Sequence, residues 1–403
     1  MNKKKIIRAS TIGLSLDIFC RGMLSELTER GYEVVALSTQ DHELEELGRR
    51  EGVRTIGVSI SRRISLRDDV LSLIRLVRVF AHEKPDMVHS MTPKAGLLCM
   101  MAAWLTRVPV RVHTFTGLVW PTSKGLSRQI LRLTDRLTCA CATHVIPEGQ
   151  GVLCDLRNGG ITRKEMHVLG YGNVRGVDMQ HYSRRPEVLA KAEAIRQHDA
   201  AGVVAGASLF RFVFVGRIVG DKGINELVEA FVKLQQSAPH GVALRLSLVG
   251  FYESEYDPVS AETRRLIDTT PEIENVGMQT GDDLLAWYAA SDCFVFPSYR
   301  EGFPNTVLEA GAMSLPAIVT DINGSREIVV PYKADQPQSA GTATGLIIPS
   351  HDAGALHDAM LWMLTHAYER RQMAAHVRPL IEAHFEQSYV RRCLYEYYDT
   401  ILK

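Results

Sequence analysis

The amino-acid sequence predicts an α/β protein with two doubly wound parallel-sheet domains that face each other across a cleft. Three observations support this prediction. Short apolar runs typical of buried strands alternate with longer patterns of helical period along most of the chain. At 403 residues the chain is too long for one ordinary core, so two domains are expected. Two segments, near the N-terminus and after residue 208, each open with a strand, a glycine-containing loop and a helix.

The elements of the first half follow from the apolar pattern in chain order. A short strand at IIRAS leads through a loop with Gly13 into one helix that ends at Gly31. Buried strands are then predicted at EVVALS, VRTIGV, DMVHSM, VRVHTF and HVIP. Helices are predicted at residues 66–82, 94–106 and 124–138. This alternation defines an N-terminal domain, residues 1–180.

The second half repeats the pattern after a break. Residues 181–208 are polar and rich in Ala and Gly, and they are predicted to be a linker region. The strands FRFVFVG, LRLSLVG, CFVFP, AIVT and GLIIP and the helix INELVEAFVKLQQ indicate a second domain, residues 209–384. Residues 331–344 are predicted to be a polar surface insertion. Residues 385–403 are predicted to form a C-terminal helix that packs back on the first domain.

Charge is balanced in the whole chain but not in its halves. There are 46 basic and 46 acidic residues, yet residues 1–180 contain 26 Lys and Arg against 18 Asp and Glu. A basic half suggests a polyanionic partner such as anionic lipid or a phosphorylated carrier, and no nucleic-acid partner is expected. Chance scatter of surface charge is the alternative reading.

Cysteine usage and the N-terminus indicate where the protein works. The seven Cys lack metal-like spacing, and Cys139 and Cys141 are predicted to share one strand face in the core. This pattern is typical of a reduced, cytosolic protein. Arg8 and Asp17 interrupt the apolar N-terminal run, and the uncharged stretch at 95–106 is shorter than a membrane span, so a chain that is soluble or peripheral to the membrane is expected.

The segment PSYREGFPNTVLEAGAMSLP, residues 297–316, carries the most specific functional signal. Glu301 lies on a predicted loop, and Glu309 lies about one turn inside a short helix that opens near Asn305. Backbone amides at a helix N-terminus bind phosphate, and carboxylates hold sugar hydroxyls. A phosphate and a polyol bound together suggest a sugar nucleotide.

Two cations follow the first strand of the second half. Arg217 and Lys222 lie in VGRIVGDKGINEL, directly after the strand FVFV, where α/β folds bind ligands. The arrangement suits a diphosphate, although both side chains could be ordinary solvated loop charges. There is no Asp-x-Asp pair and no cluster with metal-ligand spacing. The sequence therefore favours neutralisation by these two cations, with no metal and no cofactor expected.

Weaker signals lie in the first half. Gly13 has the place for close backbone approach to a ligand, or it may only form the turn. His89 and His113 end predicted strands and could donate to a ligand hydroxyl or phosphate, but a buried structural role is equally compatible. Lys124, Arg128, Arg132 and Arg136 recur every four residues along an amphipathic helix that follows Leu118, Val119 and Trp120. Such a helix can lie on a membrane surface or be an ordinary solvated face.

These residues resemble the retaining glycosyltransferases of the GT-B fold, family 4, along nearly the whole chain. The segment 297–316, followed by TDINGSREIV, is similar to the Glu-x7-Glu block of that family, and VGRIVGDKG is similar to its diphosphate-binding loop. PDMVHSMTPKAGLL and VPVRVHTFTG resemble members that extend saccharides on polyprenyl-diphosphate carriers. The resemblance implies two Rossmann-like domains, with the nucleotide-sugar donor held mainly by the second and the acceptor mainly by the first.

The resemblance also implies residue roles. Arg217 and Lys222, with Gly216, would bind the donor diphosphate, and Gly13 would lie beside it. Glu301 would hold the donor sugar and Glu309 the ribose. The segment at the helix start would bind the donor, with backbone amides around Phe303–Thr306 placing sugar and phosphate. It consists of Gly302, Phe303, Pro304, Asn305 and Thr306.

The chain departs from the family pattern in the first half. Many relatives have a His-Gly pair where this chain has Thr116-Gly117, and His113 lies three residues earlier. Either His113 or Thr116 could approach the donor sugar, which leaves the catalytic contribution of this domain open between them. His89, Lys94 and Thr116 are the candidates on the acceptor side.

The implied activity is metal-independent, retaining transfer of a hexose or N-acetylhexosamine to a saccharide acceptor. The implied donor is a UDP-sugar, and the implied acceptor is polyprenyl-diphosphate-linked, in bacterial surface polysaccharide assembly on the cytoplasmic face of the inner membrane. Three alternatives remain on the same fold: a nucleotide-sugar epimerase, a transferase to a small soluble acceptor, and a non-catalytic partner that binds sugar nucleotides.

Overall fold

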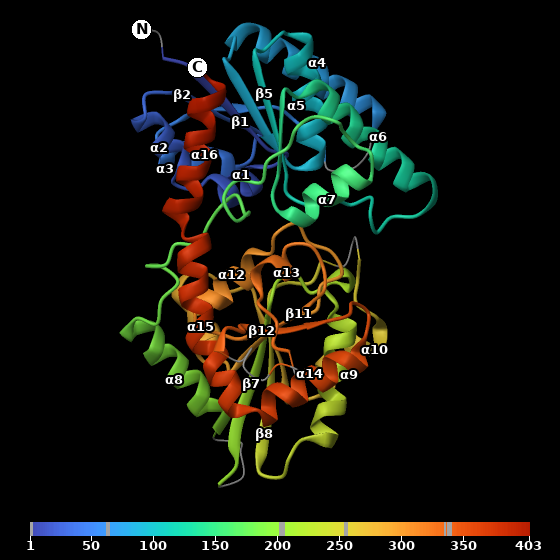
Figure 1. Cartoon of the computed structure of the whole chain (residues 1–403), viewed down its shortest axis with the longest axis vertical. Helices are drawn as coiled ribbons and strands as arrows, with labels where there is room; N and C mark the ends of the chain where they lie inside the picture. Colours follow the sequence, from blue (N-terminus) through green and yellow to red (C-terminus); the bar gives the residue numbers. More distant parts are fainter. Residues whose placement is uncertain (1–2, 62–64, 201–205, 254–256, 334–335, 337–340) are drawn as a thin grey trace. The chain divides into compact units, whose positions relative to one another are not determined.

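The computed structural model describes residues 3–61, 65–200, 206–253, 257–333, 336 and 341–403. The chain divides into two compact units. The first comprises residues 1–176 together with 387–403, and the second comprises residues 177–386. Each unit has one six-stranded sheet of parallel strands with helices packed against it (Figure 1). No helix in the described part of the chain is long and apolar enough to cross a membrane.

The sheet of the first unit has the strand order β3-β2-β1-β4-β5-β6. Its central strand β1 pairs in parallel with β2 and β4, so that Ile7 lies between Val35 and Val88. These central positions are fully buried because helices cover both faces, which explains their continuous apolar runs. The strand bounds are β1 Lys5–Ala9, β2 Glu33–Ser38, β3 Arg54–Gly57, β4 Met87–Met91, β5 Val110–Phe115 and β6 His144–Pro147.

Eight helices among the described residues of the first unit accompany this sheet: α1 Gly13–Cys20, α2 Met23–Glu29, α3 His42–Glu51, α4 Leu66–Glu83, α5 Pro93–Leu105, α6 Gly125–Cys141, α7 Gln150–Asn158 and α16 Gln387–Ile401. The sequence predicted one helix from Asp17 to Gly31, whereas the structure has two. The break occurs because Gly22 adopts a left-handed conformation with φ of 74°, which ends α1 and starts α2.

Cys139 and Cys141 do not lie on a strand, and this prediction was wrong. Both residues belong to the last turn of α6, where Cys139 is buried and Cys141 is half-buried. The apolar period of α6 continues past residue 138, and the next strand, β6, begins only at His144. Two cysteines with spacing of two therefore point in different directions, as helical geometry requires.

The sheet of the second unit has the order β12-β11-β10-β7-β8-β9, again with parallel pairs. Its strands are β7 Ser208–Val215, β8 Val242–Val249, β9 Ile273–Gly277, β10 Cys293–Phe296, β11 Ala317–Thr320 and β12 Gly345–Ile348. Strand β9 was not predicted from sequence. It lies at the edge of the sheet, and only Ile273 among its residues is buried, so its apolar signal is weak.

The helices of the second unit are α8 Pro186–Ala200, α9 Ile224–Ser237, α10 Ala261–Thr269, α11 Gly281–Ala289, α12 Asn305–Ala312, α13 Ser325–Ile328, α14 Ala353–Thr365 and α15 Ala367–Phe385, with a short 3-10 helix at Gly220–Lys222. Most of the region predicted as a linker, residues 181–208, is therefore helix α8. This helix packs against α11, and the Arg185–Asp282 and Lys191–Asp283 ion pairs tie the region to α11. The region is part of the second unit.

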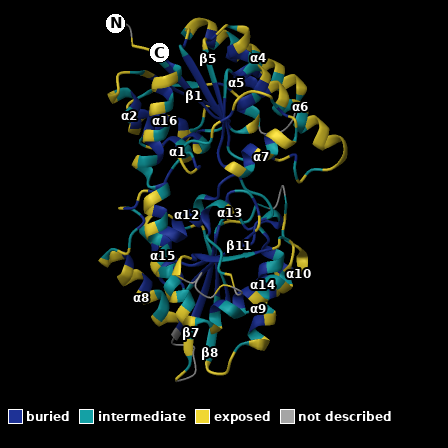
Figure 2. Ribbon diagram, viewed as in Figure 1, coloured by how far each residue is buried: buried dark blue, intermediate teal, exposed yellow. Residues whose placement is uncertain are grey.

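The C-terminal helix α16 packs within the first unit. Its residues Leu394, Tyr395 and Tyr398 are buried in a core cluster with residues of strands β1 and β2. Figure 2 shows which parts of this helix are buried and which are exposed. Arg391 of α16 forms an ion pair with Glu26 of α2, and the Tyr395 hydroxyl donates to the same carboxylate at 2.5 Å. The last segment of the chain therefore completes the domain that the first segment begins.

Strand order reverses at one point in each sheet. In the first unit the reversal lies between β1 and β4, and in the second unit between β7 and β10. Loops that leave neighbouring strands in opposite directions there form a crevice at the carboxyl ends of the strands, where ligands of open α/β sheets bind. The loops after these four strands are therefore the expected places of ligand sites.

Candidate functional site

The two loops at the reversal point of the second sheet meet through one ion pair. Lys222 of the 3-10 helix after β7 pairs with Glu301 of the loop after β10. Ser298 donates to the same carboxylate at 2.8 Å, and the Lys222 ammonium lies 5.6 Å from the centre of the Phe296 ring. Both charged side chains are mostly buried, so the pair is screened little by solvent.

Backbone contacts hold these loops together. The amide of Tyr299 donates to the carbonyl of Asp221 at 2.8 Å, directly beside Lys222. Gly223, with φ of 71°, lies so close to Pro297 that a Cβ atom there would overlap the Pro297 carbonyl oxygen. Only glycine satisfies both the conformation and the space at this position. The position of Lys222 is therefore set by a tight contact of two backbones.

Helix α12 begins four residues after Glu301. Its N-cap residue, Pro304, provides no side-chain hydrogen bond to the first turn. The partial positive charge at a helix N-terminus favours an anion there. Gly302 and Phe303 precede the helix, and the Phe303 ring packs on Phe385, while Asn305 and Thr306 are half-buried at its start. The structure thus places a helix N-terminus next to the Lys222–Glu301 pair.

A second glycine loop, in the segment TDINGSREIV, packs against this one. Gly324 has φ of 72°, and a Cβ atom there would overlap the Gly302 carbonyl oxygen. Gly324 immediately precedes the short helix α13. The dipeptide Asn323-Gly324, which is typical of a turn, is the sequence signal that identifies it, but its contact with Gly302 follows only from the tertiary structure.

The remaining donor-side candidates of the second unit lie around this centre. Glu309 is buried in α12, with its carboxylate 3.4 Å from the Tyr288 hydroxyl. Arg217 follows Gly216 at the end of β7, but it pairs with Glu253 rather than with Glu301. Its side chain is about half exposed. The structure therefore brings Lys222 and Glu301 into contact and leaves the Arg217 guanidinium outside that pair.

In the first unit, His113 borders a small cavity at the end of β5. The cavity measures about 20 Å³, which is room for about one water molecule. Ser90 hydrogen-bonds with His113 Nδ1 at 2.9 Å, and a side chain at Gly96 would overlap the imidazole ring. Burial lowers the pKa of His113 to about 3. The ring is therefore neutral near pH 7, so it can form hydrogen bonds but does not act as a positively charged general acid.

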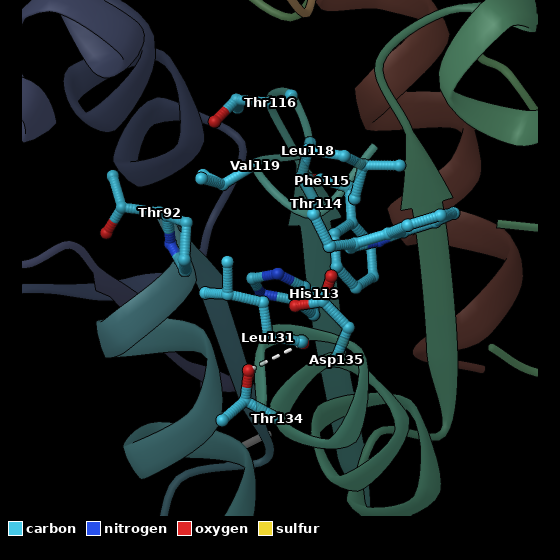
Figure 3. A pocket seen from close by; sticks show the side chains of 13 residues that line it. Thr92, His113, Thr114, Phe115, Thr116, Leu118, Val119, Leu131, Thr134 and Asp135 are labelled. Carbon is cyan, nitrogen blue, oxygen red and sulfur yellow. Dashed lines mark hydrogen bonds between the residues drawn. The ribbon is translucent and has the colours of Figure 1, made fainter. Parts of the chain in front are cut away.

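The cavity also contains an acidic side chain that sequence reasoning did not consider. Asp135 of α6 faces it beside His113, with Leu131 and Thr134 from the same helix (Figure 3). Burial raises the pKa of Asp135 to about 7, against a smaller opposing effect of the Trp120 indole. Thr116 lines the same cavity, so both first-domain candidates, His113 and Thr116, border one space.

Three other candidates of the first unit have structural partners. His89 is buried, and its ring hydrogen-bonds with the Tyr398 hydroxyl at 2.5 Å and with the Thr114 hydroxyl at 2.7 Å. These contacts favour a structural role over a ligand-binding one. Gly13 is the first residue of α1, and its amide donates to Asp41 at 2.9 Å. Lys94 pairs with Asp69 of α4 at 2.8 Å.

The basic residues predicted on helix α6 lie beside Trp120 and the loop that follows helix α7. Trp120 is buried, with the guanidinium groups of Arg128 and Arg132 over its ring at 5.8 and 5.5 Å. Arg132 and Arg136 donate to the backbone carbonyls of Gly159 and Gly160. Arg132 is half-buried by these contacts, whereas Lys124, Arg128 and Arg136 remain exposed, and the apolar stripe of the helix is exposed as well.

The described residues contain no group of three or more His, Cys, Asp or Glu side chains placed to hold a metal ion. What the second unit offers is a cation, a carboxylate, a hydroxyl and a helix N-terminus at the carboxyl ends of two strands. These groups can neutralise a phosphate and accept hydrogen bonds from a polyol.

Comparison with known proteins adds to this geometry. Residues 210–366 match the family model described as glycosyl transferases group 1, and residues 18–172 match the one described as glycosyl transferase 4-like domain. The capsular polysaccharide biosynthesis glycosyltransferase CapM of Staphylococcus aureus is 27% identical, over 100% of this chain and 99% of that protein. An Escherichia coli enzyme named UDP-Gal:alpha-D-GlcNAc-diphosphoundecaprenol alpha-1,3-galactosyltransferase is 29% identical over 67% of each chain.

Solved structures are similar in fold. Anabaena Alr3699/HepE in complex with UDP superposes with a TM-score of 0.75 and 16% identity, covering 98% of this chain and 100% of that one. WaaG, a glycosyltransferase involved in lipopolysaccharide biosynthesis, gives a TM-score of 0.65 and 17% identity, covering 96% and 98%. At these identities the likeness concerns the fold alone, and it confirms the predicted GT-B architecture of two parallel-sheet domains.

Proposed function

Because this chain belongs to the group 1 and 4-like glycosyltransferases, we propose that it transfers a sugar from a nucleotide donor to a lipid-linked saccharide. The donor in this proposal is a UDP-hexose or UDP-N-acetylhexosamine. The acceptor is a polyprenyl-diphosphate-linked saccharide, and the product enters bacterial surface polysaccharide. The enzyme would work peripherally on the cytoplasmic face of the membrane.

One observation carries the donor assignment. The Lys222–Glu301 pair lies at the reversal point of the second sheet, four residues before the N-terminus of α12. A cation and a helix N-terminus suit the two phosphates, and a carboxylate beside them suits the hydroxyls of the attached sugar. The name of the Escherichia coli relative, which specifies a UDP-Gal donor, supports uridine diphosphate as the nucleotide.

We assign the residue roles from this geometry and from the family pattern. Lys222 and Arg217, with the backbone at Gly216, would neutralise the diphosphate, and Arg217 would exchange Glu253 for a phosphate oxygen. Glu301 would hold the sugar hydroxyls. Glu309 would accept hydrogen bonds from the ribose. The backbone N–H groups of residues 302, 303, 305 and 306 would place the sugar and the β-phosphate, since Pro304 has no N–H group to donate.

The main catalytic contribution in this proposal is electrostatic. The bond between the anomeric carbon and the diphosphate oxygen breaks, and its electron pair leaves with the diphosphate, next to Lys222 and the start of α12. The acceptor hydroxyl oxygen forms the new bond on the same face, and its proton passes to the departing phosphate oxygen. Configuration would therefore be retained. His113 or Thr116 of the first unit would contribute a hydrogen bond to the donor sugar.

The acceptor assignment rests on the relatives. The Escherichia coli relative is named for a diphosphoundecaprenol acceptor, and so is an N-acetylgalactosaminyltransferase of Campylobacter jejuni that is 24% identical over 79% of this chain. The name of the Staphylococcus aureus relative supports a polysaccharide product. The positive surplus of residues 1–180 is consistent with an anionic acceptor.

The decisive experiment has two stages. A panel of UDP-, GDP- and ADP-sugars is first scored by thermal shift, because specific donor binding raises apparent stability. The best donor is then incubated with a short polyprenyl-diphosphate disaccharide, and the product is analysed by mass spectrometry and by NMR at the new anomeric centre. A glycosylated lipid product of retained configuration is expected. Inverted configuration would reject the mechanism, and donor turnover without an acceptor would indicate an epimerase.

A further inference from the structure

Three neighbouring helices of the first unit, α4, α5 and α6, carry an unusual share of exposed apolar side chains. We refer to them as the outer helical layer; α4 packs on α5, and α5 packs on α6. Ten of the eighteen large hydrophobic side chains that are exposed in the described part of the chain lie on this layer. They are Leu66, Val70, Leu71, Ile74, Trp104, Leu105, Leu126, Ile130, Leu133 and Leu137. Figure 2 shows exposed residues along α4 and α6.

The exposed side chains of α6 form one stripe. Leu126, Ile130, Leu133 and Leu137 follow the spacing of a single helical face, and Leu126 is 76% exposed. The opposite face, with Leu131, Thr134 and Asp135, borders the His113 cavity (Figure 3). The helix therefore presents Thr134 and Asp135 to the protein and exposes an apolar stripe that an ordinary surface helix would bury.

Helix α4 repeats this feature. Leu66, Val70 and Ile74 recur every four residues and are exposed, Leu66 by 83%. The core contacts of α4 are made instead by Ser72, Leu76 and Phe80 on another face. Exposed apolar side chains gathered along helix faces in this way mark an interaction surface.

The charges of the outer helical layer are mostly positive. Six exposed basic side chains lie on it or at its helix start: Arg67, Arg75, Arg78, Lys124, Arg128 and Arg136. Of its acidic residues, Asp69 pairs with Lys94, Glu83 pairs with Lys5 and Arg54, and Asp135 faces the cavity. Asp68 is the acidic side chain that remains exposed. The layer thus combines apolar residues with uncompensated positive charge.

We propose that the outer helical layer is the surface by which this protein docks onto an anionic lipid membrane, with the apolar stripes of α4 and α6 inserted at the interface. Interfacial helices bind in this way when apolar side chains enter the acyl boundary and basic side chains meet anionic headgroups. A second copy of the chain fits this surface poorly, because two copies would bring two positive faces together.

The choice of a membrane as the partner rests on the proposed function, because a polyprenyl-linked acceptor is itself held in a lipid bilayer. It also deepens that function. The inner face of α6 borders the cavity of His113 and Thr116, so a membrane on the outer face would lie one helix away from the first-domain residues assigned to the reaction.

Flotation with vesicles tests the surface. The full-length protein is mixed with vesicles of phosphatidylcholine alone, or of phosphatidylcholine with phosphatidylglycerol. The triple variant Leu126→Ser/Ile130→Ser/Leu133→Ser is compared with the control Leu189→Ser/Tyr368→Ser, whose residues are exposed by 43% and 64% in the second unit. We expect the wild type and the control to float with anionic vesicles, and the triple variant to bind at least about tenfold more weakly.

A charge reversal tests the electrostatic part separately. Arg75→Glu on α4 is expected to weaken binding to anionic vesicles about fivefold or more, whereas Arg371→Glu, an exposed arginine of the second unit, is expected to leave binding unchanged. Equal flotation of the wild type and the triple variant would overturn the proposal. Sedimentation that shows a dimer lost in the triple variant, with no vesicle binding by the wild type, would overturn it in favour of a second copy.

Two readouts separate this proposal from the proposed function. Donor binding in the thermal-shift panel and transfer to a short, water-soluble acceptor should be the same in the wild type and the triple variant. If transfer occurs but no protein floats, the docking surface is wrong and the function stands. If the wild type floats, the triple variant does not, and no donor binds, the proposed function is wrong and the docking surface stands.

Discussion

Lys222 and Glu301 form an ion pair between the loop after β7 and the loop after β10, although 79 residues separate them in the chain. The pair holds the two loops at the point where the strand order of the second sheet reverses. Neither side chain is strongly exposed, and Ser298 adds a third polar group. A ligand that replaces one partner must supply equivalent charge, which a sugar diphosphate does.

Replacement of Lys222 by alanine should remove most turnover. Without the ammonium group, the departing diphosphate loses a fixed charge, and the rate is expected to fall by about 100-fold or more. The measurement is kcat from product formation with the donor found by thermal shift. Lys191→Ala is the matched control, because Lys191 pairs with Asp283 on the surface of the same unit. Wild-type rates in Lys222→Ala would end the assignment of this residue.

Replacement of Gly223 by alanine should disturb the donor loops by steric overlap. A Cβ atom there overlaps the Pro297 carbonyl oxygen, so the two loops must separate. Gly277→Ala is the control, since Gly277 has a similar φ of 77° but open space around its Cβ position. Both variants should lose about 1–2 kcal/mol of unfolding free energy from backbone strain.

Beyond that shared loss, only the Gly223→Ala variant should show a further loss of about 1–3 kcal/mol from the overlap and should fail to bind the donor. Urea denaturation and thermal shift measure the two effects. Equal losses in both variants would show that the contact with Pro297 is unimportant.

Asp135 predicts a dependence of stability on pH. Its pKa is raised to about 7 in the folded state, above the usual value of 3.8, so the folded state binds more protons than the unfolded state between these pH values. The contribution of protonated Asp135 to the free energy of unfolding is therefore complete below about pH 4, and it is lost as pH rises through about 7. Asparagine does not ionise, so the Asp135→Asn variant avoids this loss. It should be about 2–4 kcal/mol more stable than the wild type at about pH 8.

Urea denaturation between about pH 4.5 and 7.5 tests this, because the stability difference between Asp135→Asn and the wild type should widen across that range. Burial lowers the pKa of His113 to about 3 and adds a dependence of opposite sign, but both proteins contain this ring, so its effect cancels in the comparison. Glu396→Gln, an exposed carboxylate of α16, is the control and should shift stability little. A stability difference between Asp135→Asn and the wild type that does not change with pH would contradict the prediction.

The hydrogen bonds of Tyr398 should stabilise the packing of α16 in the first unit. Its hydroxyl accepts from the Arg8 guanidinium at 2.5 Å and bonds with His89 at the same distance, and Arg8 is fully buried. Tyr398→Phe leaves this buried cation with fewer partners and should cost about 1–3 kcal/mol in unfolding free energy. Tyr397→Phe is the neighbouring control, because none of the hydrogen bonds among the described residues involves that hydroxyl. A similar cost for both variants would mean that the hydrogen bonds to Tyr398 contribute little.

The architecture could be predicted because its signals are local. Strands buried on both faces, such as β1 and β4, appear as short apolar runs, and the helices between them have their own period. Prediction failed where the signal was weak or local rules were ambiguous. The edge strand β9 has one buried residue, α8 was assigned to a linker, and Gly22 divided a helix that the apolar pattern made continuous.

The site was predictable in its residue types but not in its contacts. The sequence predicted Lys222 and Glu301 for one donor site, and the structure brings them into direct contact. Arg217 was predicted beside them, yet its guanidinium pairs with Glu253. The loops that carry these residues meet because β7 and β10 are neighbours in the sheet, a pairing between strands far apart in sequence.

The sequence by itself determined the two-domain α/β architecture, the family, and the residues from which a donor site can be built, because periodicity and loop motifs are properties of short segments. Tertiary structure alone decided that α6 turns its apolar stripe outward and places Asp135 beside His113. An amphipathic pattern shows that a helix has two faces but not which face meets the core. That choice depends on what the neighbouring elements can bury, and here the Trp120 ring and the carbonyls of Gly159 and Gly160 hold the basic side.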